Sequence, residues 1–366
     1  MMPKKPKQVT IKDIARIAEV SASTVSLVLN NKKGIGKETR YRILRIAKEL
    51  NYTPNLLARS LAKQHTDIIA VTILQTRNAL FMEIAAGVEE VLKECGYSIN
   101  MVSTYDDPDL ETKELASARA RGVDGFLVSS AMLESPGIRL LVEDQVPLVS
   151  VLRRVPGLAN LNYFMEDSFK GGYLAASHLI RLGHKRIAIL KGHSWTTTGS
   201  GRLDGAIDAM KEHGIPVNEK LIMQGNFSKE PAYLSTLAMF KAVSEKEMPT
   251  AIYACNDDMA MGAYEAILDS GLRVPEDIAL VGFNNAAYTS LQTVSLTTID
   301  VQAHEMGRLG AERLIDMINR KKGYSKPLQV VMEPKLIVRK SCGYQAGAAA
   351  SSHESDANSG LRLGAA

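Results

Sequence analysis

Short apolar runs alternate with amphipathic segments along residues 68–281, and this alternation constrains the fold more than any other feature of the chain. Runs such as 68–74 and 125–128 have the length of buried strands, and the segments between them, such as 79–95, repeat their apolar residues with helical spacing. Strands that alternate with helices form parallel sheets. The pattern occurs twice, so we predict two similar α/β subdomains, each a doubly wound parallel sheet.

Polar side chains follow these predicted strands at their carboxyl ends. Because ligands of open α/β sheets bind outside the carboxyl ends of the strands, we expect a small-molecule cleft between the two subdomains. The strand ends provide candidate contacts, among them Arg77, Ser129, Arg153, Trp195, Asn256 and Asn284. Trp195 is the only tryptophan. Its ring either stacks on a ligand or packs within one subdomain.

The charged residues are distributed unevenly along the chain. Residues 1–66 hold 14 Lys and Arg against four Asp and Glu, a net charge of +10, whereas residues 67–366 carry −6. A short basic segment is typical of a protein that binds the phosphate backbone of nucleic acid, and the alternative is a solvated surface. The concentration of the charge in one segment favours nucleic acid.

The basic segment has the pattern of three short helices. Thr10 and Asp13 resemble a capping box for a first helix that runs to about residue 18, and Ser21 is a good N-cap for a second helix over 22–30. Two helices joined by a turn of this length are typical of a helix-turn-helix. A third helix over 37–50 closes a small core. Its expected buried residues are Ile43, Leu44, Ile46, Ala47 and Leu50.

Several motifs of residues 9–61 occur together in one family. They are Val9-Thr10-Ile11-Lys12-Asp13-Ile14-Ala15, Val20-Ser21, Thr24-Val25-Ser26, Val28-Leu29-Asn30, Glu38-Thr39-Arg40, Leu50-Asn51-Tyr52, Pro54-Asn55 and Ala58-Arg59-Ser60-Leu61. This set resembles the head of the lactose/galactose repressor (LacI/GalR) family of bacterial transcription regulators, and the similarity continues to about residue 341. The resemblance implies an all-α helix-turn-helix head, a hinge helix, and an α/β body like that of periplasmic binding proteins.

The resemblance implies DNA contacts for nine residues of the head. Small polar residues at matching positions hold phosphates and set the register, and three residues of the second helix face the major groove. The phosphate contacts are Thr10, Ser21, Thr24, Ser26, Asn30 and Thr39, and the groove-facing residues are Ala22, Ser23 and Leu27.

Two residues of the head depart from the family pattern. Glu19 stands where the family usually has Gly, and a non-Gly residue in left-handed geometry costs about 1 kcal/mol or more. Leu27 stands where many members have Arg or another polar residue that reads bases. We therefore expect a reshaped turn, and an operator that differs from those of better-known relatives.

Residues 54–66 match the family's hinge helix, which folds only when two chains lie side by side in the minor groove. Asn55, Arg59 and Leu61 stand at the expected positions, with Leu61 as the wedge between base pairs and Arg59 lining the groove. The segment is too short to form a stable helix alone. The alternative is a plain interdomain linker.

In the body, the resemblance assigns Arg202 and Asn256 to the effector site. At Asn284 most relatives have an Asp whose carboxylate holds sugar hydroxyls, so this site has lost one negative charge. Together with the arginines at the strand ends, this predicts a cationic pocket and an anionic effector, such as a sugar acid or a sugar phosphate. A neutral sugar, with Arg153 or Arg154 facing solvent or paired with the acidic body, is the alternative.

Other activities lack the residues that they need. The histidines have no partner at metal-ligand spacing, and residues 194–199 match neither glycine-rich nucleotide motif. No G-x-S-x-G motif is present, so we expect no enzymatic activity, no metal and no cofactor besides the effector. No apolar run approaches about 18 residues, and the basic N-terminus is not a signal peptide. We expect a cytoplasmic protein that does not bind membranes.

The resemblance also sets the expected boundaries. They are a disordered basic tail at 1–8, the helix-turn-helix domain at 9–53, the hinge at 54–66, the effector-binding and dimerisation domain at 67–341, and a disordered tail at 342–366. The N-subdomain would comprise about 67–166 and 296–326, and the C-subdomain about 167–295 and 327–341. The C-terminal tail has no leucine heptads, so a homodimer is expected rather than a tetramer.

These patterns together predict an effector-responsive transcription regulator. As a repressor of carbohydrate or related catabolic genes, it would bind a pseudo-palindromic operator in double-stranded DNA. The alternative is a cytoplasmic α/β protein that binds a small molecule and has only non-specific affinity for DNA.

Overall fold

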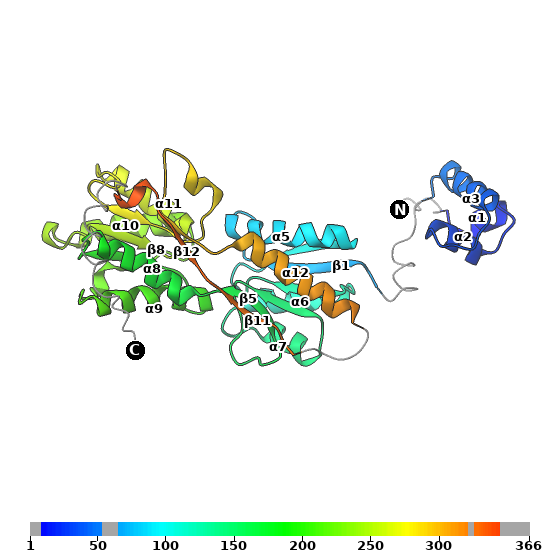
Figure 1. Cartoon of the computed structure of the whole chain (residues 1–366), viewed down its shortest axis with the longest axis horizontal. Helices are drawn as coiled ribbons and strands as arrows, with labels where there is room; N and C mark the ends of the chain where they lie inside the picture. The colour runs from blue at the N-terminus through cyan, green and yellow to red at the C-terminus, as the bar shows by residue number, and fades with distance from the viewer. Residues whose placement is uncertain (1–8, 53–64, 321–325, 345–366) are drawn as a thin grey trace, which may run out of the picture. The chain divides into compact units, whose positions relative to one another are not determined.

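The computed structural model describes residues 9–52, 65–320 and 326–344. The chain divides into two compact units, Met1–Thr66 and Asp67–Ala366, which we call the head and the body (Figure 1). Within the described ranges, no helix is both long enough and apolar enough to cross a membrane.

The head contains three helices around a small core. They are α1 (Ile11–Ile17), α2 (Ala22–Leu29) and α3 (Lys37–Glu49), and their buried apolar residues form one cluster. The expected burial of Leu44 is wrong, since this side chain is 46% exposed. Ile43, Ile46 and Ala47 lie on one face of α3 with spacing i, i+3, i+4, and Leu44 falls outside that stripe.

Both predicted N-caps of the head are confirmed. Thr10 and Asp13 form a capping box, in which the Thr10 amide donates to Asp13 Oδ2 at 3.0 Å. Ser21 Oγ accepts a hydrogen bond from the Thr24 amide at 3.1 Å. These side chains satisfy amides that have no partner within the helix, and so they fix where α1 and α2 begin.

Glu19 adopts the left-handed conformation in the turn between α1 and α2. Its φ is 52°, and the following Val20 amide donates to Ala15 O at 3.1 Å. The turn therefore keeps the geometry that favours glycine, although a side chain with a Cβ occupies it.

We expect Glu19→Gly to stabilise the head by roughly 0.5–1 kcal/mol, because the relief of left-handed strain exceeds the entropy that glycine loses on folding. Amide hydrogen exchange of buried head residues such as Ile46 should slow by about two- to fivefold in the full chain. Glu19→Ala retains a Cβ and serves as the control. Equal exchange rates in the wild type and Glu19→Gly would contradict the strain argument.

The first lobe of the body contains a six-stranded parallel sheet with the order β11-β5-β4-β3-β1-β2. Its strands are β1 (Ile68–Ile73), β2 (Ser98–Ser103), β3 (Gly125–Val128), β4 (Leu148–Val151), β5 (Asn162–Glu166) and β11 (Gln329–Met332). Its helices are α5 (Ala79–Cys95), α6 (Pro108–Ala120), α7 (Pro136–Glu143) and α12 (Ala303–Asn319). We call this part the N-lobe.

Alternate residues of the N-lobe strands belong to different hydrophobic clusters. Ile69, Val71 and Ile73 pack with residues of α5 and α12, whereas Ala70 packs with residues of α6 and α7. Because successive side chains of a strand point to opposite faces, one helix pair covers each face of the sheet (Figure 1). The predicted doubly wound architecture is confirmed here.

The second lobe, the C-lobe, has a four-stranded parallel sheet with the order β7-β6-β8-β9. Its strands are β6 (Ile187–Lys191), β7 (Ile222–Gln224), β8 (Ala251–Ala254) and β9 (Ala279–Val281). Its helices are α8 (Ser168–Arg181), α9 (Thr197–Glu212), α10 (Lys229–Ala242) and α11 (Asp257–Asp269). The pairs α8/α9 and α10/α11 each pack together, on either side of this sheet (Figure 1).

The chain crosses between the lobes three times. It leaves the N-lobe after β5, returns after β10 (Thr298–Asp300), and leaves it again between β11 and β12 (Lys335–Ile337). The boundary expected at residue 327 is therefore wrong, because β11 pairs with β5 in the N-lobe sheet. The strand β12 pairs antiparallel with β10 instead.

The expected start of the C-terminal tail at residue 342 is also wrong. Cys342 is 2% exposed, and its Sγ accepts a hydrogen bond from Thr297 Oγ1 at 3.1 Å. The neighbouring Ser341 Oγ donates to Leu280 O of β9 at 2.6 Å. Residues up to Tyr344 thus belong to the body.

Candidate functional site

The residues expected to read bases lie on the exposed side of α2. Ala22 and Ser23 are exposed, and Leu27 is 42% exposed although it is a large apolar side chain. On the opposite side of the helix, Val25 and Val28 are buried in the head's core. The helix therefore presents two methyl-bearing side chains and one hydroxyl outward, which suits apolar contact with thymine methyl groups and one polar contact in a major groove.

The residues expected to contact phosphates lie around the ends of these helices. Thr10, Ser21 and Asn30 are exposed, and Thr24, Ser26 and Thr39 are half-buried. Several of them also hold the backbone, since Asn30 Nδ2 donates to Ser26 O at 2.8 Å and Ser21 caps α2. Their polar groups are thus held in place within the head. The expected hinge residues Asn55, Arg59 and Leu61 lie outside the described residues.

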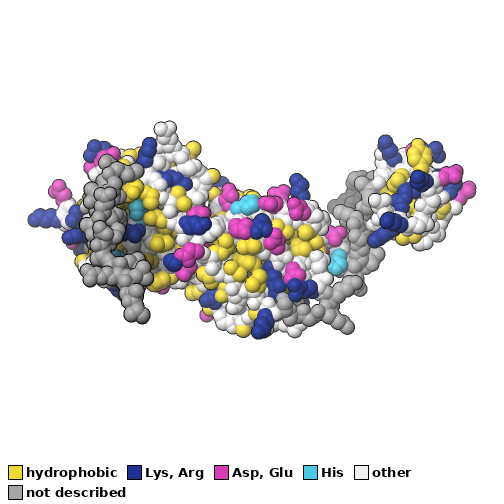
Figure 2. Space-filling model, in the orientation of Figure 1, with side chains coloured by type: hydrophobic (Ala, Val, Ile, Leu, Met, Phe, Trp, Pro, Cys, Tyr) yellow, Lys and Arg dark blue, Asp and Glu magenta, His cyan; other side chains and the backbone are white. Residues whose placement is uncertain are grey.

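Arg40 has a structural role that the sequence analysis did not assign. Its guanidinium donates to Asn31 Oδ1 at 3.0 Å and to Lys32 O, and so it fixes the loop between α2 and α3. Other Lys and Arg side chains lie at several places on the visible face of the head (Figure 2). The described part of the head therefore combines a rigid α2 with a cationic surface, which are the two components of sequence-specific DNA binding.

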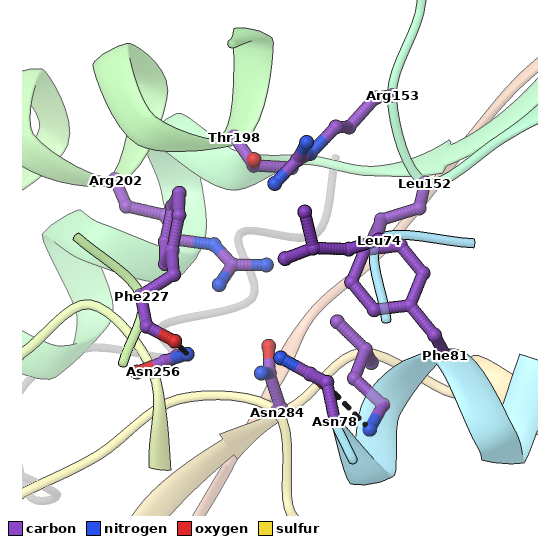
Figure 3. A pocket seen from close by; sticks show the side chains of 11 residues that line it. Leu74, Asn78, Phe81, Leu152, Arg153, Thr198, Arg202, Phe227, Asn256 and Asn284 are labelled. Atoms are coloured by element: carbon purple, nitrogen blue, oxygen red, sulfur yellow. Dashed lines mark hydrogen bonds between the residues drawn. The ribbon is translucent and has the colours of Figure 1, made fainter. Parts of the chain in front are cut away.

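The body holds a cleft between its lobes, lined by residues of both. The lining residues are Leu74, Asn78, Leu80, Phe81, Leu152, Arg153, Thr198, Arg202, Phe227, Asn256 and Asn284 (Figure 3). Its cavity of about 10 Å³ has room for roughly one water molecule. The side chains that line the cleft therefore fill most of it.

Arg202 lines this cleft from the C-lobe, and its guanidinium reaches into the pocket (Figure 3). It lies on α9, is 2% exposed, and its Nη2 donates to Glu166 Oε1 at 2.8 Å. Its Nη1 donates to Cys255 O at 2.8 Å, and its guanidinium carbon lies 3.8 Å from the centroid of the Phe283 ring. A buried carboxylate, a carbonyl and an aromatic face thus fix this guanidinium.

Arg153 enters the cleft from the N-lobe. It is 2% exposed, and its Nη1 donates to Asp106 Oδ1 at 2.5 Å. Figure 3 shows its guanidinium and that of Arg202 both reaching into the pocket. Each cleft arginine therefore has a buried acidic partner, and the expectation of a cationic pocket is wrong.

Asn256 and Asn284 also line the cleft but differ in their hydrogen bonds. Asn256 caps α11, with its Oδ1 accepting from the Met259 amide at 2.9 Å and its Nδ2 donating to Phe227 O at 3.1 Å. Asn284 has a φ of 115°, and its buried Oδ1 accepts no hydrogen bond in the structure. Asn284 thus has a free acceptor for a ligand, whereas both polar atoms of the Asn256 side chain are hydrogen-bonded within the protein.

Three of the expected effector contacts do not line this cavity. Arg77 is exposed, and Ser129 is fully buried and donates its hydroxyl to Thr72 O. Trp195 is 47% exposed and stacks on His193, with ring centroids 4.3 Å apart. Its carbonyl accepts a hydrogen bond from the Leu133 amide of the N-lobe at 2.9 Å, so Trp195 lies at a contact between the lobes.

The sequence analysis missed Phe81 and Phe227 as cleft residues. Phe81 lies on α5, and Phe227 follows β7 in a turn in which Asn226 and Phe227 both have φ near 54°. A search for polar side chains at strand ends does not find aromatic rings. The left-handed backbone at Asn226 and Phe227 leaves no plain signal either, because neither residue is glycine.

Two carboxyl groups near the cleft have strongly raised pKa values. Burial is the main cause that raises the pKa of Glu111 to about 7, with Ser135 opposing this rise and Asp106 adding to it. Burial also raises the pKa of Asp257 to about 7, although Thr298 Oγ1 and the Ala286 amide donate to this carboxyl at 2.6 and 2.8 Å. Asp257 is the first residue of α11 after the N-cap Asn256, and its side chain links α11 to β10.

Two family profiles match the two units of the chain. "Bacterial regulatory proteins, lacI family" matches residues 10–55, and "Periplasmic binding protein-like domain" matches residues 176–342. The HTH-type transcriptional repressor PurR of Haemophilus influenzae is 35% identical over 334 residues, which are 91% of this chain and 98% of that protein. The chain belongs to the LacI family.

Solved structures of LacI-family proteins have the same fold. The lac repressor dimer bound to operator and the anti-inducer ONPF has a TM-score of 0.79 and 27% identity, over 92% of this LacI-family chain and 99% of the repressor. The complex of the transcriptional regulator CelR with cellobiose has a TM-score of 0.68 and 27% identity, over 91% of this chain and 100% of the CelR chain. These likenesses extend over both the head and the body.

Proposed function

We propose that the protein is an effector-responsive transcription regulator that binds a pseudo-palindromic operator in double-stranded DNA as a homodimer and represses transcription. The exposed outer side of α2, with Ala22, Ser23 and Leu27, carries this proposal. A similar repressor is bound to operator as a dimer, and a second relative is named a transcriptional repressor. The protein would act in the cytoplasm, without catalysing a reaction.

Leu27→Glu is expected to weaken specific operator binding at least tenfold, or about 1.4 kcal/mol. The change removes an apolar contact in the major groove and places a carboxylate among phosphates. Leu27 is 42% exposed and lies outside the head's core, so the variant should still fold.

Leu44→Glu is the matched control for this experiment. It introduces the same charge at a side chain of α3 that is 46% exposed. Mobility shifts at two salt concentrations would measure both variants, because non-specific binding is lost more steeply with salt. Equal losses of specific binding in the two variants would mean that α2 does not read the operator.

For the effector, we infer a neutral molecule rich in hydroxyl groups, such as a sugar, that binds in the cleft between the lobes. Both cleft arginines are already paired with buried carboxylates, so a sugar acid or sugar phosphate would bring a third negative charge close to Glu166 and Asp106. The acceptor of Asn284 suits a hydroxyl group. The CelR relative was solved with a neutral sugar, cellobiose.

Trp195 gives a direct test of the effector class, because it is the only tryptophan and lies where the lobes meet. We expect a saturable change of its fluorescence with a neutral sugar, and no response to the matching uronic, aldonic or phosphorylated sugar. An effector that shifts operator affinity should do so by roughly 1–3 kcal/mol, with the same coupling measured in either direction. A response limited to the anionic compounds would contradict the neutral class.

A further inference from the structure

The guanidinium of Arg153 fills the cleft as a bound ligand would. Its central carbon lies 5.8 Å from the centroid of the Phe81 ring and 5.6 Å from that of the Phe227 ring. Its Nη1 contacts Asp106 Oδ1 at 2.5 Å. Two aromatic faces and a carboxylate form the kind of site that binds a planar cation.

We propose that Asp106, Phe81 and Phe227 form a guanidinium-binding slot, that Arg153 occupies this slot as an internal ligand, and that its contacts there hold the two lobes together. This internal contact goes beyond the proposed function, and it can be tested without DNA or effector.

Asp106 is held in place for this role. Tyr105 and Asp106 have φ values of 53° and 55°, a left-handed pair that directs Asp106 inward, and the Asp106 side chain is 4% exposed. Its Oδ2 has no hydrogen-bond partner and lies 3.9 Å from His193 Nε2. Burial lowers the pKa of His193 below its usual value of 6.5 and outweighs the nearby Asp106, which raises it, while Arg153 lowers it further, so the neutral form is favoured near pH 7. Arg153 is then the cation that contacts Asp106.

The slot is built from both lobes. Arg153, Asp106 and Phe81 belong to the N-lobe, whereas Phe227 and His193 belong to the C-lobe. The hydrogen bond from the Leu133 amide to Trp195 O also joins the lobes, beside this cluster. Because Arg153 contacts rings on both sides, its withdrawal removes an attraction between the lobes and leaves a cavity in its place.

Chemical rescue tests the slot in the full-length chain. In Arg153→Ala we expect ethylguanidinium to bind the vacated slot at millimolar concentrations, with a saturable change in Trp195 fluorescence back toward that of the wild type. The wild type should respond at least about tenfold more weakly, since a tethered side chain has a millimolar or higher effective concentration. Arg154→Ala, which removes the neighbouring arginine over Tyr163, should behave like the wild type.

Adding Asp106→Asn to Arg153→Ala should abolish the rescue. The proposal is overturned by a folded Arg153→Ala variant that shows no saturable response, or by an equal response in the wild type or in the double variant. If Arg153→Ala does not fold, the single variant Asp106→Asn provides the test. It removes the ionic partner of Arg153 and leaves no unpaired buried carboxylate. Small-angle X-ray scattering should then show a larger radius of gyration than that of the wild type, and an unchanged radius would overturn the proposal.

Discussion

Replacing Arg202 by Met should lower the free energy of unfolding of the body by about 3–5 kcal/mol, because it leaves Glu166 charged and buried without its cation. Both side chains are almost fully buried, with side-chain exposures of 2% for Arg202 and 1% for Glu166. The substitution also removes the hydrogen bond from Arg202 to Cys255 O and the contact of the guanidinium with the Phe283 ring. Urea unfolding followed by circular dichroism would measure the loss.

The double variant Arg202→Met/Glu166→Gln is the matched control. It removes both charges of the pair, and replacing a whole buried ion pair by neutral groups is often neutral or stabilising. We expect it to recover most of the stability that the single variant loses. A single variant that loses less than about 1 kcal/mol, or a double variant no more stable than the single one, would contradict the role of this pair.

Glu111→Gln is expected to stabilise the body by up to about 3 kcal/mol at pH 8, and by less than about 1 kcal/mol at pH 5. Glu111 is fully buried on α6, and neither of its carboxyl oxygens has a hydrogen-bond partner in the structure. Burial raises its pKa from 4.5 to about 7 in the folded chain. Ionisation of this group therefore opposes folding at neutral and alkaline pH.

The direction of the pH dependence follows from the raised pKa. The contribution of Glu111 to stability is fully present below its unfolded pKa, and it is lost as the pH rises through about 7. Urea unfolding at pH 5 and pH 8 measures it, with Glu143→Gln as the control at an exposed glutamate of α7. An equal gain in both variants, or a gain confined to pH 5, would contradict the account.

The architecture of the body could be predicted because its signals are local. Strand length and helical spacing can be seen within about 15 residues, and they give β1, β3, β4 and the helices between them. In contrast, β11 and β12 are strands of four and three residues whose partners, β5 and β10, lie far away in the sequence. Without a long run or a regular alternation, such strands leave no local signal.

The start of α9 shows a different limit. Residues 194–202 hold two glycines and several hydroxyl residues, and glycine disfavours helix, so their sequence gives little sign of a helix start. In the structure α9 begins at Thr197, capped by Thr196, and a Cβ at Gly199 would lie 1.9 Å from His193 O. Gly199 is thus needed for close packing rather than for a loop, and Arg202 lies on a helix.

The charge balance of the cleft was also beyond sequence reasoning. The arginines could be placed at strand ends or by resemblance, but their acidic partners lie 47 and 36 residues away and follow no motif. Counting arginines therefore predicted a cationic pocket, whereas the fold pairs each one with a buried acid. The head was more predictable, because its caps and α2 face depend on residues three or four positions apart.

The central claim is that this LacI-family chain recognises a particular DNA sequence through its head. Selection of bound fragments from the source genome by the purified full-length protein, at roughly physiological salt, tests it most directly. The account predicts that a few fragments are strongly enriched, that they share one inverted repeat, and that Leu27→Glu loses this enrichment while it remains folded. The account would be contradicted if all fragments were retained equally, with no shared repeat, and if Leu27→Glu retained the same fragments as the wild type.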